Sequence, residues 1–139
     1  MEYTISESVT PDIEREISRI ASSSYSEDGV SLYDSYKITT RDTDTLRMYM
    51  DEAYGDIVAR MVDVASLTTT GISFYLPDFD STMNDSVQSI LDDFVANRVI
   101  SSWLQEKGDV KSEIYTRKAS SLLDKAHIIL KSRKAPKRK

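Results

Sequence analysis

The segment 84–107 constrains the fold more than any other, because its helical pattern carries apolar side chains in two directions. The first half keeps a single apolar stripe, made of Val87, Ile90, Leu91 and Phe94. At about 100° per residue, a further apolar set points to nearly the opposite side, made of Val99, Ile100, Trp103 and Leu104. A helix of a small bundle normally needs one such stripe. This helix is therefore either wrapped by other elements or shared between its own core and a neighbouring molecule.

The second stripe favours self-association or the docking of a partner. Burying a large apolar side chain is worth about 1.5–3 kcal/mol relative to leaving it exposed, so an uncovered stripe would be costly and adhesive. Trp103 is either a core residue or an anchor on a partner. Arg98 either covers apolar surface with its stem or pairs with an acid of a neighbouring subunit. The candidate subunit or partner interface is Arg98, Val99, Ile100, Trp103 and Leu104.

Three further helices are predicted from shorter patterns. Thr10, Pro11 and Asp12 are typical of a helix start. A periodic apolar face over about 43–65 predicts a second long helix, with Asp42 and Asp44 as capping residues. Gly108 is suited to end the helix 84–107, so only a short turn separates it from the last helix and the two should run roughly antiparallel.

The alternation over 72–76 predicts a strand, paired in a small hairpin with residues 67–70. The stretch "SLYDSYKITT" has room for a short extended segment. At 139 residues the chain has room for one domain. The sequence therefore predicts a mainly α fold: an antiparallel helical bundle of about four helices with a small β-hairpin insertion over residues 1–130, and a disordered basic C-terminal tail over 131–139.

The composition and the absence of catalytic motifs argue against an enzymatic function. The absence of cysteine excludes disulfides, zinc–thiolate sites and thiol nucleophiles, and His127 is the single histidine. Neither a phosphate-binding glycine loop nor a nucleophile-elbow motif occurs. We therefore expect no enzymatic activity, no catalytic residues and no cofactor or metal. The acidic run "DFDSTMND" is interpreted as a capping segment, although a metal-dependent enzyme using Asp78 and Asp80 is a third possibility. Asp92 and Asp93 are interpreted as solvated surface.

Charge divides the chain into two parts. Residues 1–130 hold all 23 acids against 12 Lys and Arg, whereas residues 131–139 carry six bases and no acid. No apolar run approaches the roughly 20 residues of a bilayer span, so we expect a cytosolic protein without a membrane. The basic segment 131–139 is suited to contact DNA phosphates or an acidic groove on a protein. The plain alternative is a disordered end that only increases solubility. The candidate contact residues are Lys131, Arg133, Lys134, Lys137, Arg138 and Lys139.

The order of elements from "RDTDTLRMYMDEAYGDIVARMVD" through a small β excursion to "NDSVQSILDDFVANRVISSWLQEKGD" and "ASSLLDKAHIILKSR" resembles the head-to-tail connector (adaptor) proteins of tailed bacteriophages. The resemblance spans about residues 41–133. It includes an Asp-x-Asp-x-Leu entry into an amphipathic helix, at Asp42, Asp44 and Leu46. It also includes a helix with Val99, Ile100, Trp103 and Leu104 in an apolar-apolar-x-x-Trp-Leu pattern. The first 40 residues have no counterpart in this likeness.

The resemblance implies a virion structural protein without a reaction. It would form a homo-oligomeric ring, of perhaps 12 subunits, beneath the portal protein, made in the host bacterial cytoplasm. Such a ring bridges the portal to the tail or stopper proteins and lines a channel for DNA, which gives the basic tail a portal or non-specific DNA contact. The alternative is a small helical nucleic-acid-binding regulator that uses the tail on DNA or RNA.

Overall fold

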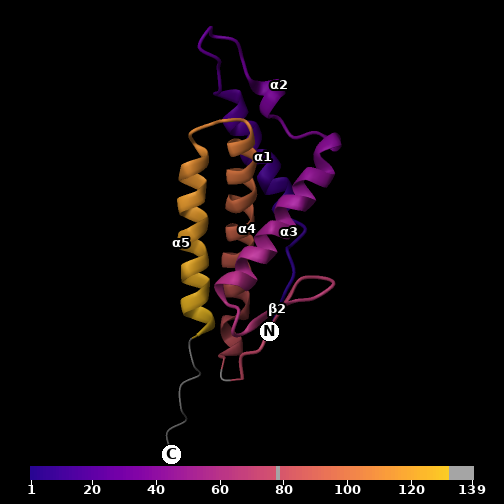
Figure 1. Cartoon of the computed structure of the whole chain (residues 1–139), viewed down its shortest axis with the longest axis vertical. Helices are drawn as coiled ribbons and strands as arrows, with labels where there is room; N and C mark the ends of the chain where they lie inside the picture. The colour runs from indigo at the N-terminus through magenta and orange to yellow at the C-terminus, as the bar shows by residue number, and fades with distance from the viewer. Residues whose placement is uncertain (78, 132–139) are drawn as a thin grey trace, which may run out of the picture.

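The computed structural model describes residues 1–77 and 79–131 (Figure 1). Within these ranges the fold is a helical bundle with a small antiparallel sheet, which confirms the predicted fold class. Residues 132–139, which are all but the first residue of the predicted tail 131–139, lie outside the described residues. The helices of 14 residues or more in the described part are α1 (Val9–Ser22), α3 (Thr43–Arg60), α4 (Asn84–Glu106) and α5 (Ser112–Leu130). None of the described helices is long and apolar enough to cross a bilayer.

Helix α4 is the central element of the bundle. It packs against α1, α3 and α5, and Figure 1 shows α5 and α3 on opposite sides of it. Its buried side chains therefore point in several directions: Val87, Leu91, Phe94, Val95, Val99, Ile100, Ser101, Ser102, Trp103 and Leu104. The two apolar stripes arise because neighbouring helices of the same chain cover α4 on more than one side.

The turn between α4 and α5 fixes their antiparallel packing. Gly108 has φ of 71°, a left-handed conformation that glycine adopts without steric cost. The backbone N–H of Gly108 donates to the Gln105 carbonyl at 3.0 Å, and that of Asp109 donates to the Leu104 carbonyl at 2.9 Å. These bonds satisfy carbonyls at the end of α4, as the glycine predicted.

The short 3-10 helix η1 (Thr40–Asp42) leads into α3 and has its own capping contacts. The backbone N–H of Thr39 donates to the Asp42 carboxylate at 2.8 Å, and the N–H of Arg41 donates to the Thr39 hydroxyl at 3.3 Å. Asp42 therefore completes the capping box of η1, whereas as the N-cap residue of α3 its side chain makes no capping hydrogen bond. Helix α3 ends at Arg60, five residues earlier than the apolar periodicity predicted, because the chain turns there into the sheet.

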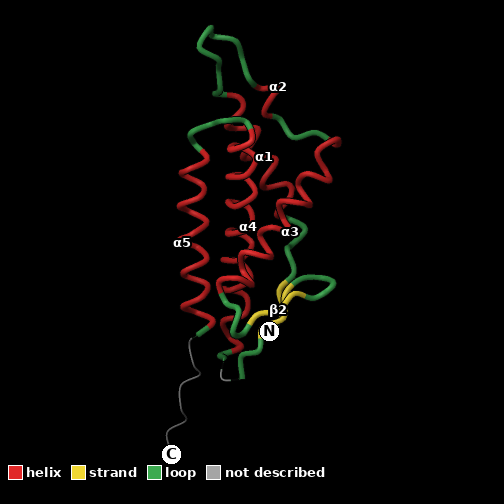
Figure 2. The backbone as a smooth tube through the Cα atoms, in the orientation of Figure 1, coloured by secondary structure: helices red, strands yellow, loops and turns green. Residues whose placement is uncertain are grey.

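The sheet has three strands in the order β1-β3-β2, made of β1 (Glu2–Tyr3), β2 (Ala65–Leu67) and β3 (Ile72–Phe74) (Figure 2). The β2–β3 hairpin confirms the predicted small hairpin, although its first strand is Ala65–Leu67 rather than residues 67–70, and Ser66 lies opposite Ser73. Strand β1 was not predicted, because two residues carry no readable alternation. It places the N-terminus beside the hairpin, with Tyr3 opposite Ile72.

The connection between α1 and α3, where the sequence has room for a short extended segment, contains a short helix and extended backbone at Lys37 and Thr39. Residues Tyr33–Tyr36 form the short helix α2. Tyr36 is buried, its carbonyl accepts a hydrogen bond from Trp103 Nε1 at 2.7 Å, and its hydroxyl donates to Asp109 at 2.9 Å. The helix was not predicted, because these tertiary contacts, which periodicity does not report, hold the segment against α4.

Asp92 anchors the N-terminal segment to α4. Its carboxylate accepts hydrogen bonds from the Tyr3 hydroxyl at 2.8 Å, the Ser6 backbone N–H at 3.2 Å and the Ser6 hydroxyl at 2.5 Å. The interpretation of Asp92 as solvated surface was therefore wrong. Its donors come from residues more than 80 positions away in the sequence, so no local pattern indicated them.

Replacing this carboxylate should loosen the N-terminus. We expect Asp92→Ala to lower the free energy of unfolding by about 1–2 kcal/mol, because the buried Tyr3 hydroxyl loses its acceptor. Urea unfolding followed by circular dichroism measures the change. Asp85→Ala, at an exposed acid near the start of the same helix, is the matched control and should change stability by less than about 0.5 kcal/mol. Equal losses in the two variants would contradict the anchoring role.

Candidate functional site

The predicted apolar interface lies inside the chain's own core. Val99 and Leu104 are 0% exposed, Trp103 is 2% exposed and Ile100 is 4% exposed. Trp103 is covered by α2, which accepts its indole N–H, and the Lys107 ammonium lies 4.9 Å from the centre of its ring. The prediction that a second molecule covers this stripe was therefore wrong, since α4 is wrapped by its own neighbours.

Arg98 finds its acidic partners within the same chain. Its Nε donates to Asp56 Oδ2 at 2.7 Å, its Nη2 lies 3.7 Å from Glu52 Oε2, and its Nη1 donates to the Ser102 hydroxyl. The side chain is 29% exposed, so the stem is covered while the head reaches the rim of the α3–α4 contact. Arg98 joins two helices of one subunit, which corrects its assignment to an intersubunit interface.

A second polar contact joins the same two helices. The Tyr49 hydroxyl of α3 donates to Glu106 at the end of α4. Burial, together with the hydrogen bond to the Glu106 carboxylate and its charge, raises the pKa of Tyr49 to about 12. Tyr49 therefore stays protonated and remains a donor at neutral pH. The contact braces α3 on α4 and supplies no reactive group.

Helix α1 contacts α5 through a cluster that the sequence analysis did not identify. The Tyr115 hydroxyl donates to Glu16 Oε1 at 2.6 Å, and the Arg19 guanidinium binds the same carboxylate at 2.5 Å. The hydrogen bond from Arg19 lowers the pKa of Glu16 to about 2, although burial acts in the opposite direction. Only the Glu16–Arg19 spacing was visible in the sequence, because Tyr115 lies 99 residues away from Glu16.

This cluster predicts a pH-dependent contribution to stability. A carboxyl group whose pKa is lowered on folding stabilises the fold above its ordinary pKa of 4.5, and the contribution is lost as pH falls towards 2. Because Arg19 is largely exposed, we expect Glu16→Gln to cost less than about 1 kcal/mol at pH 7. Urea unfolding at pH 7 and pH 2 should show this difference shrinking at low pH. Glu14→Gln on the same helix is the control, and a difference unchanged by pH would contradict the cluster.

The described start of the basic tail is tied to the bundle. Lys131 Nζ donates to Asp63 Oδ2 at 2.6 Å, and this hydrogen bond lowers the pKa of Asp63. Lys131 is thus engaged within the chain, beside the lower end of α3. The other predicted contact residues lie outside the described residues, namely Arg133, Lys134, Lys137, Arg138 and Lys139.

The acidic run before α4 is a capping segment where the structure describes it. Asp80 accepts hydrogen bonds from the Thr82 backbone N–H at 3.0 Å and from its hydroxyl at 2.8 Å, at the start of η2 (Ser81–Met83). Asp78, the other residue of the possible metal-dependent enzyme, lies outside the described residues. Across residues 1–77 and 79–131, no group of three or more His, Asp or Glu side chains is arranged to hold a metal ion.

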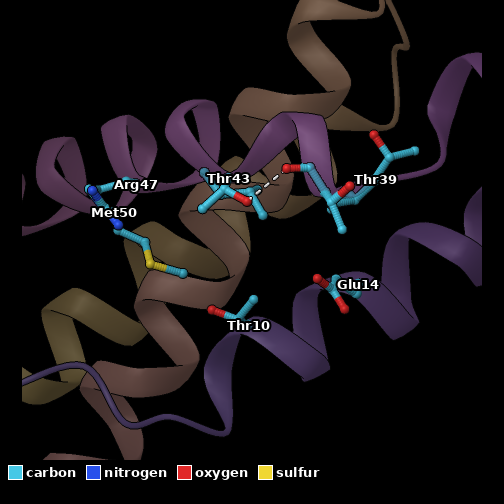
Figure 3. Close-up of a pocket in the computed structure, with 9 residues that line it drawn as sticks. Thr10, Glu14, Thr39, Thr43, Arg47 and Met50 are labelled. Carbon is cyan, nitrogen blue, oxygen red and sulfur yellow. Dashed lines mark hydrogen bonds between the residues drawn. The ribbon is translucent and has the colours of Figure 1, made fainter.

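A pocket of about 510 Å³ lies between α1 and the start of α3 (Figure 3). Thr10 and Glu14 line it from α1, and Arg47 and Met50 line it from α3. The lining combines one acid, one base, four threonines and an apolar floor, so it does not select a single class of ligand.

A smaller groove of about 300 Å³ between α1 and α4 is acidic, lined by Asp12, Asp85, Asp92 and Asp93. Burial raises the pKa of Asp93, and the adjacent carboxylates of Asp92 and Asp12 add to the effect. This groove repels anions and belongs in part to the N-terminal anchor already described.

Charge is distributed unevenly along the sequence. Residues 111–139, which include α5, carry ten Lys and Arg against two acids, whereas residues 1–110 carry eight Lys and Arg against 21 acids. Within the described helices, α5 carries three Lys and Arg against two acids, whereas α3 carries two Arg against four acids. Helix α3 is therefore acidic, and α5 has a small excess of base. Opposite charges on different surfaces of one subunit favour contacts between unlike surfaces of neighbouring copies.

The chain stands without detectable relatives in the comparisons: no protein-family model, no curated protein and no solved structure matches it.

Proposed function

We propose that this protein is a structural, non-enzymatic subunit of the head-to-tail connector of a tailed bacteriophage, assembled as a ring beneath the portal. The observation that carries the proposal is the order of elements from residue 41 onward. An amphipathic helix α3, a small β hairpin, a long helix α4, a short turn and a final helix α5 follow one another as the resemblance implies. The proposal therefore rests on that likeness and on a fold compatible with it.

The surfaces that serve the proposed ring differ from those that the sequence suggested. Trp103 and its neighbours stabilise the subunit, so contacts between subunits must use side chains that are exposed on the folded chain. Charged helix faces on α3 and α5 are available for this purpose. A ring of perhaps 12 such subunits would connect the portal to the tail or stopper proteins around the DNA channel.

The basic C-terminal segment has a place in this proposal. Lys131 leaves the bundle at the end opposite the α4–α5 turn, so the residues after it begin at one end of the elongated subunit (Figure 1). Six basic residues in the last nine suit an acidic groove on the portal or the phosphates of passing DNA. Either contact would be independent of DNA sequence.

A nucleic-acid-binding regulator is the second candidate, favoured by the excess of ten bases over two acids in residues 111–139. Under this alternative, affinity for DNA or RNA comes mainly from phosphate contacts and falls steeply as salt is raised. The connector candidate instead requires binding to a portal protein. The two candidates therefore differ in partner and in the consequence of removing the tail.

The test uses the full chain and a variant that ends at Lys131, so that its bond to Asp63 is kept. Binding is measured to a purified portal protein of a tailed bacteriophage, and separately to duplex DNA over a salt series. The connector proposal expects the full chain to bind the portal and the shortened chain to retain self-association. A chain of full length with Gln at the basic positions after 131 controls for tail length. The connector proposal would be contradicted if the protein is a dimer that binds DNA tightly, loses this binding when the tail is removed, and does not bind the portal.

A further inference from the structure

We infer that copies of this chain associate side by side, with the outer face of α3 from one copy packed on the outer face of α5 from the next. The inference deepens the proposed function, because it names the surfaces that would close the ring. It is argued from two short helical stripes with opposite charge and the same spacing.

The first stripe is on α3 and consists of Asp44, Met48 and Asp51. All three side chains are exposed, and Met48 is 50% exposed in a chain whose other large apolar residues on this helix are mostly covered. Their i, i+4, i+7 spacing places them on one helix face. Neither carboxylate has an ion-pair partner among residues 1–77 and 79–131. The α3 stripe therefore presents an apolar side chain between two acids, with the exposed Arg47 beside them on the same helix.

The second stripe is on α5 and consists of Lys118, Leu122 and Lys125. Both lysines are exposed, Leu122 is partly buried, and the spacing is again i, i+4, i+7. Lys118 and Leu122 line a shallow groove of about 470 Å³ together with Asn97, Arg117 and Ser121. Lys125 has no ion-pair partner in the described part of the chain, and the Lys118 ammonium lies over the Tyr115 ring at 5.1 Å.

The two stripes match in order and in length. Seven residues of helix separate the outer charges of each stripe, which is about 10 Å along either axis. With the helices side by side and parallel, Asp44 lies opposite Lys118, Met48 opposite Leu122, and Asp51 opposite Lys125. Met48 then enters the groove beside Leu122, while the charges flank this apolar contact. Opposite charges set the register, and apolar burial adds stability.

The placement of the helices prevents the stripes from meeting within one subunit. α3 and α5 lie on different sides of α4, and both run from the upper to the lower end of the molecule in Figure 1. Their lower ends approach, where Arg60 bonds to Asp124 at 2.7 Å, but the α3 stripe lies in the other half of α3. A contact between two unlike surfaces joins subunits head to tail, and it forms a ring when its rotation closes.

A second copy of the chain offers a complementary surface to both stripes, whereas duplex DNA is complementary only to the α5 stripe. Duplex DNA would be attracted to Lys118 and Lys125 but repelled by Asp44 and Asp51, and it offers nothing apolar to Leu122. The chain itself carries a complementary partner for each of the three positions. We therefore commit to a second copy as the occupant of the α5 groove.

The first experiment reverses the charges of each stripe in the full chain. Sedimentation velocity is measured for Asp44→Lys with Asp51→Lys, for Lys118→Glu with Lys125→Glu, for the two variants mixed, and for one chain with all four changes. We expect each reversal alone to weaken self-association by about tenfold or more, because attraction becomes repulsion. The mixture and the fourfold variant should recover it. Asp28→Lys with Asp34→Lys reverses two exposed acids away from the stripe and should leave association unchanged.

Recovery by charge exchange supports the inference, and failure of the fourfold variant to recover overturns it. Loss of duplex DNA binding by Lys118→Glu with Lys125→Glu, at unchanged oligomer mass, also overturns it, since the α5 stripe would then serve nucleic acid. Portal binding by these variants separates this result from the proposed function. If the charge reversals leave self-association unchanged and the variants still bind the portal, only the inference is contradicted. If the fourfold variant recovers self-association but no variant binds the portal, only the proposed function is contradicted.

The second experiment joins the stripes covalently. The chain has no cysteine, so Met48→Cys with Leu122→Cys places two thiols on surfaces that should meet between copies. A disulfide requires Cα atoms about 4.4–6.8 Å apart. Mild oxidation should give a ladder of covalent oligomers whose longest member counts the subunits. Tyr75→Cys with Leu122→Cys is the control and should give no ladder beyond a dimer. An unlinked monomer from the first pair, under conditions where the protein self-associates, would overturn the packing.

Discussion

Trp103→Ala is expected to lower the free energy of unfolding by about 3–5 kcal/mol, the range for emptying a buried aromatic site. The side chain is 2% exposed, so truncation leaves a cavity beside α4. It also removes the indole donor from the Tyr36 carbonyl and the ring beneath Lys107. Thermal and urea unfolding followed by circular dichroism measure the loss. We expect the contacts of α2 to loosen before the bundle unfolds, since Tyr36 belongs to that helix.

Tyr75→Ala is the matched control for this prediction, because Tyr75 is an aromatic residue that is 77% exposed. Its removal should change stability by less than about 0.5 kcal/mol. Trp103 is also the single tryptophan of the chain, so its fluorescence reports directly on the core. Emission at the long wavelengths of a water-exposed indole in the native protein, or a Trp103→Ala variant as stable as the control, would contradict its burial.

Gly71→Ala is expected to be the next most damaging substitution, at about 3 kcal/mol. A Cβ atom at this position would lie 2.1 Å from the Tyr3 carbonyl oxygen, which is far inside van der Waals contact. Because the obstacle is backbone, strand β1 has to move away from β3. The burial of Tyr3 and its hydrogen bond to Asp92 are then lost together. Amide hydrogen exchange at residues 2–5 measures the detachment, and urea unfolding measures the stability.

Gly55→Ala provides a control of opposite sign. Gly55 lies within α3, and nothing lies within 4 Å of the added Cβ. Because alanine has the higher helix propensity, this substitution should stabilise the protein by about 0.5–1 kcal/mol. If Gly71→Ala were as harmless as Gly55→Ala, the close approach of β1 to the hairpin would be wrong.

The bundle was predictable because its helices are long and strongly patterned. The apolar periodicity of 43–65 and the glycine at 108 gave α3 and the antiparallel α4–α5 pair with small errors at the ends. The two apolar faces of α4 were also read correctly as a pattern. Their interpretation failed, because a helix covered by several neighbours of its own chain has the same sequence pattern as a helix shared with a partner.

The parts that were missed depend on contacts between distant residues. Strand β1 is two residues long, and the hydrogen bonds of Asp92 reach across more than 80 positions. Helix α2 forms where Tyr36 docks on Trp103, in a stretch where the sequence analysis placed no helix. Local propensity is a weak prior that such tertiary contacts override.

The charged stripes illustrate a different limit. The i, i+4, i+7 spacings of Asp44, Met48 and Asp51, and of Lys118, Leu122 and Lys125, are present in the sequence. Many such triplets occur on any amphipathic helix, so spacing alone selects none of them. Only exposure, missing ion-pair partners and the positions of α3 and α5 around α4 distinguish these two sets. The candidate assembly surface therefore required the fold, although its chemistry was visible in the residues.

Sedimentation equilibrium of the full chain, over a range of protein concentrations at low and high salt, tests the central claim most directly. The account predicts a single closed oligomer at low salt, with a mass that is a whole-number multiple of the 15.8 kDa chain. Because the flanking contacts are electrostatic, high salt should shift it towards the monomer. A 15.8 kDa monomer at every concentration and both salt levels would contradict the account.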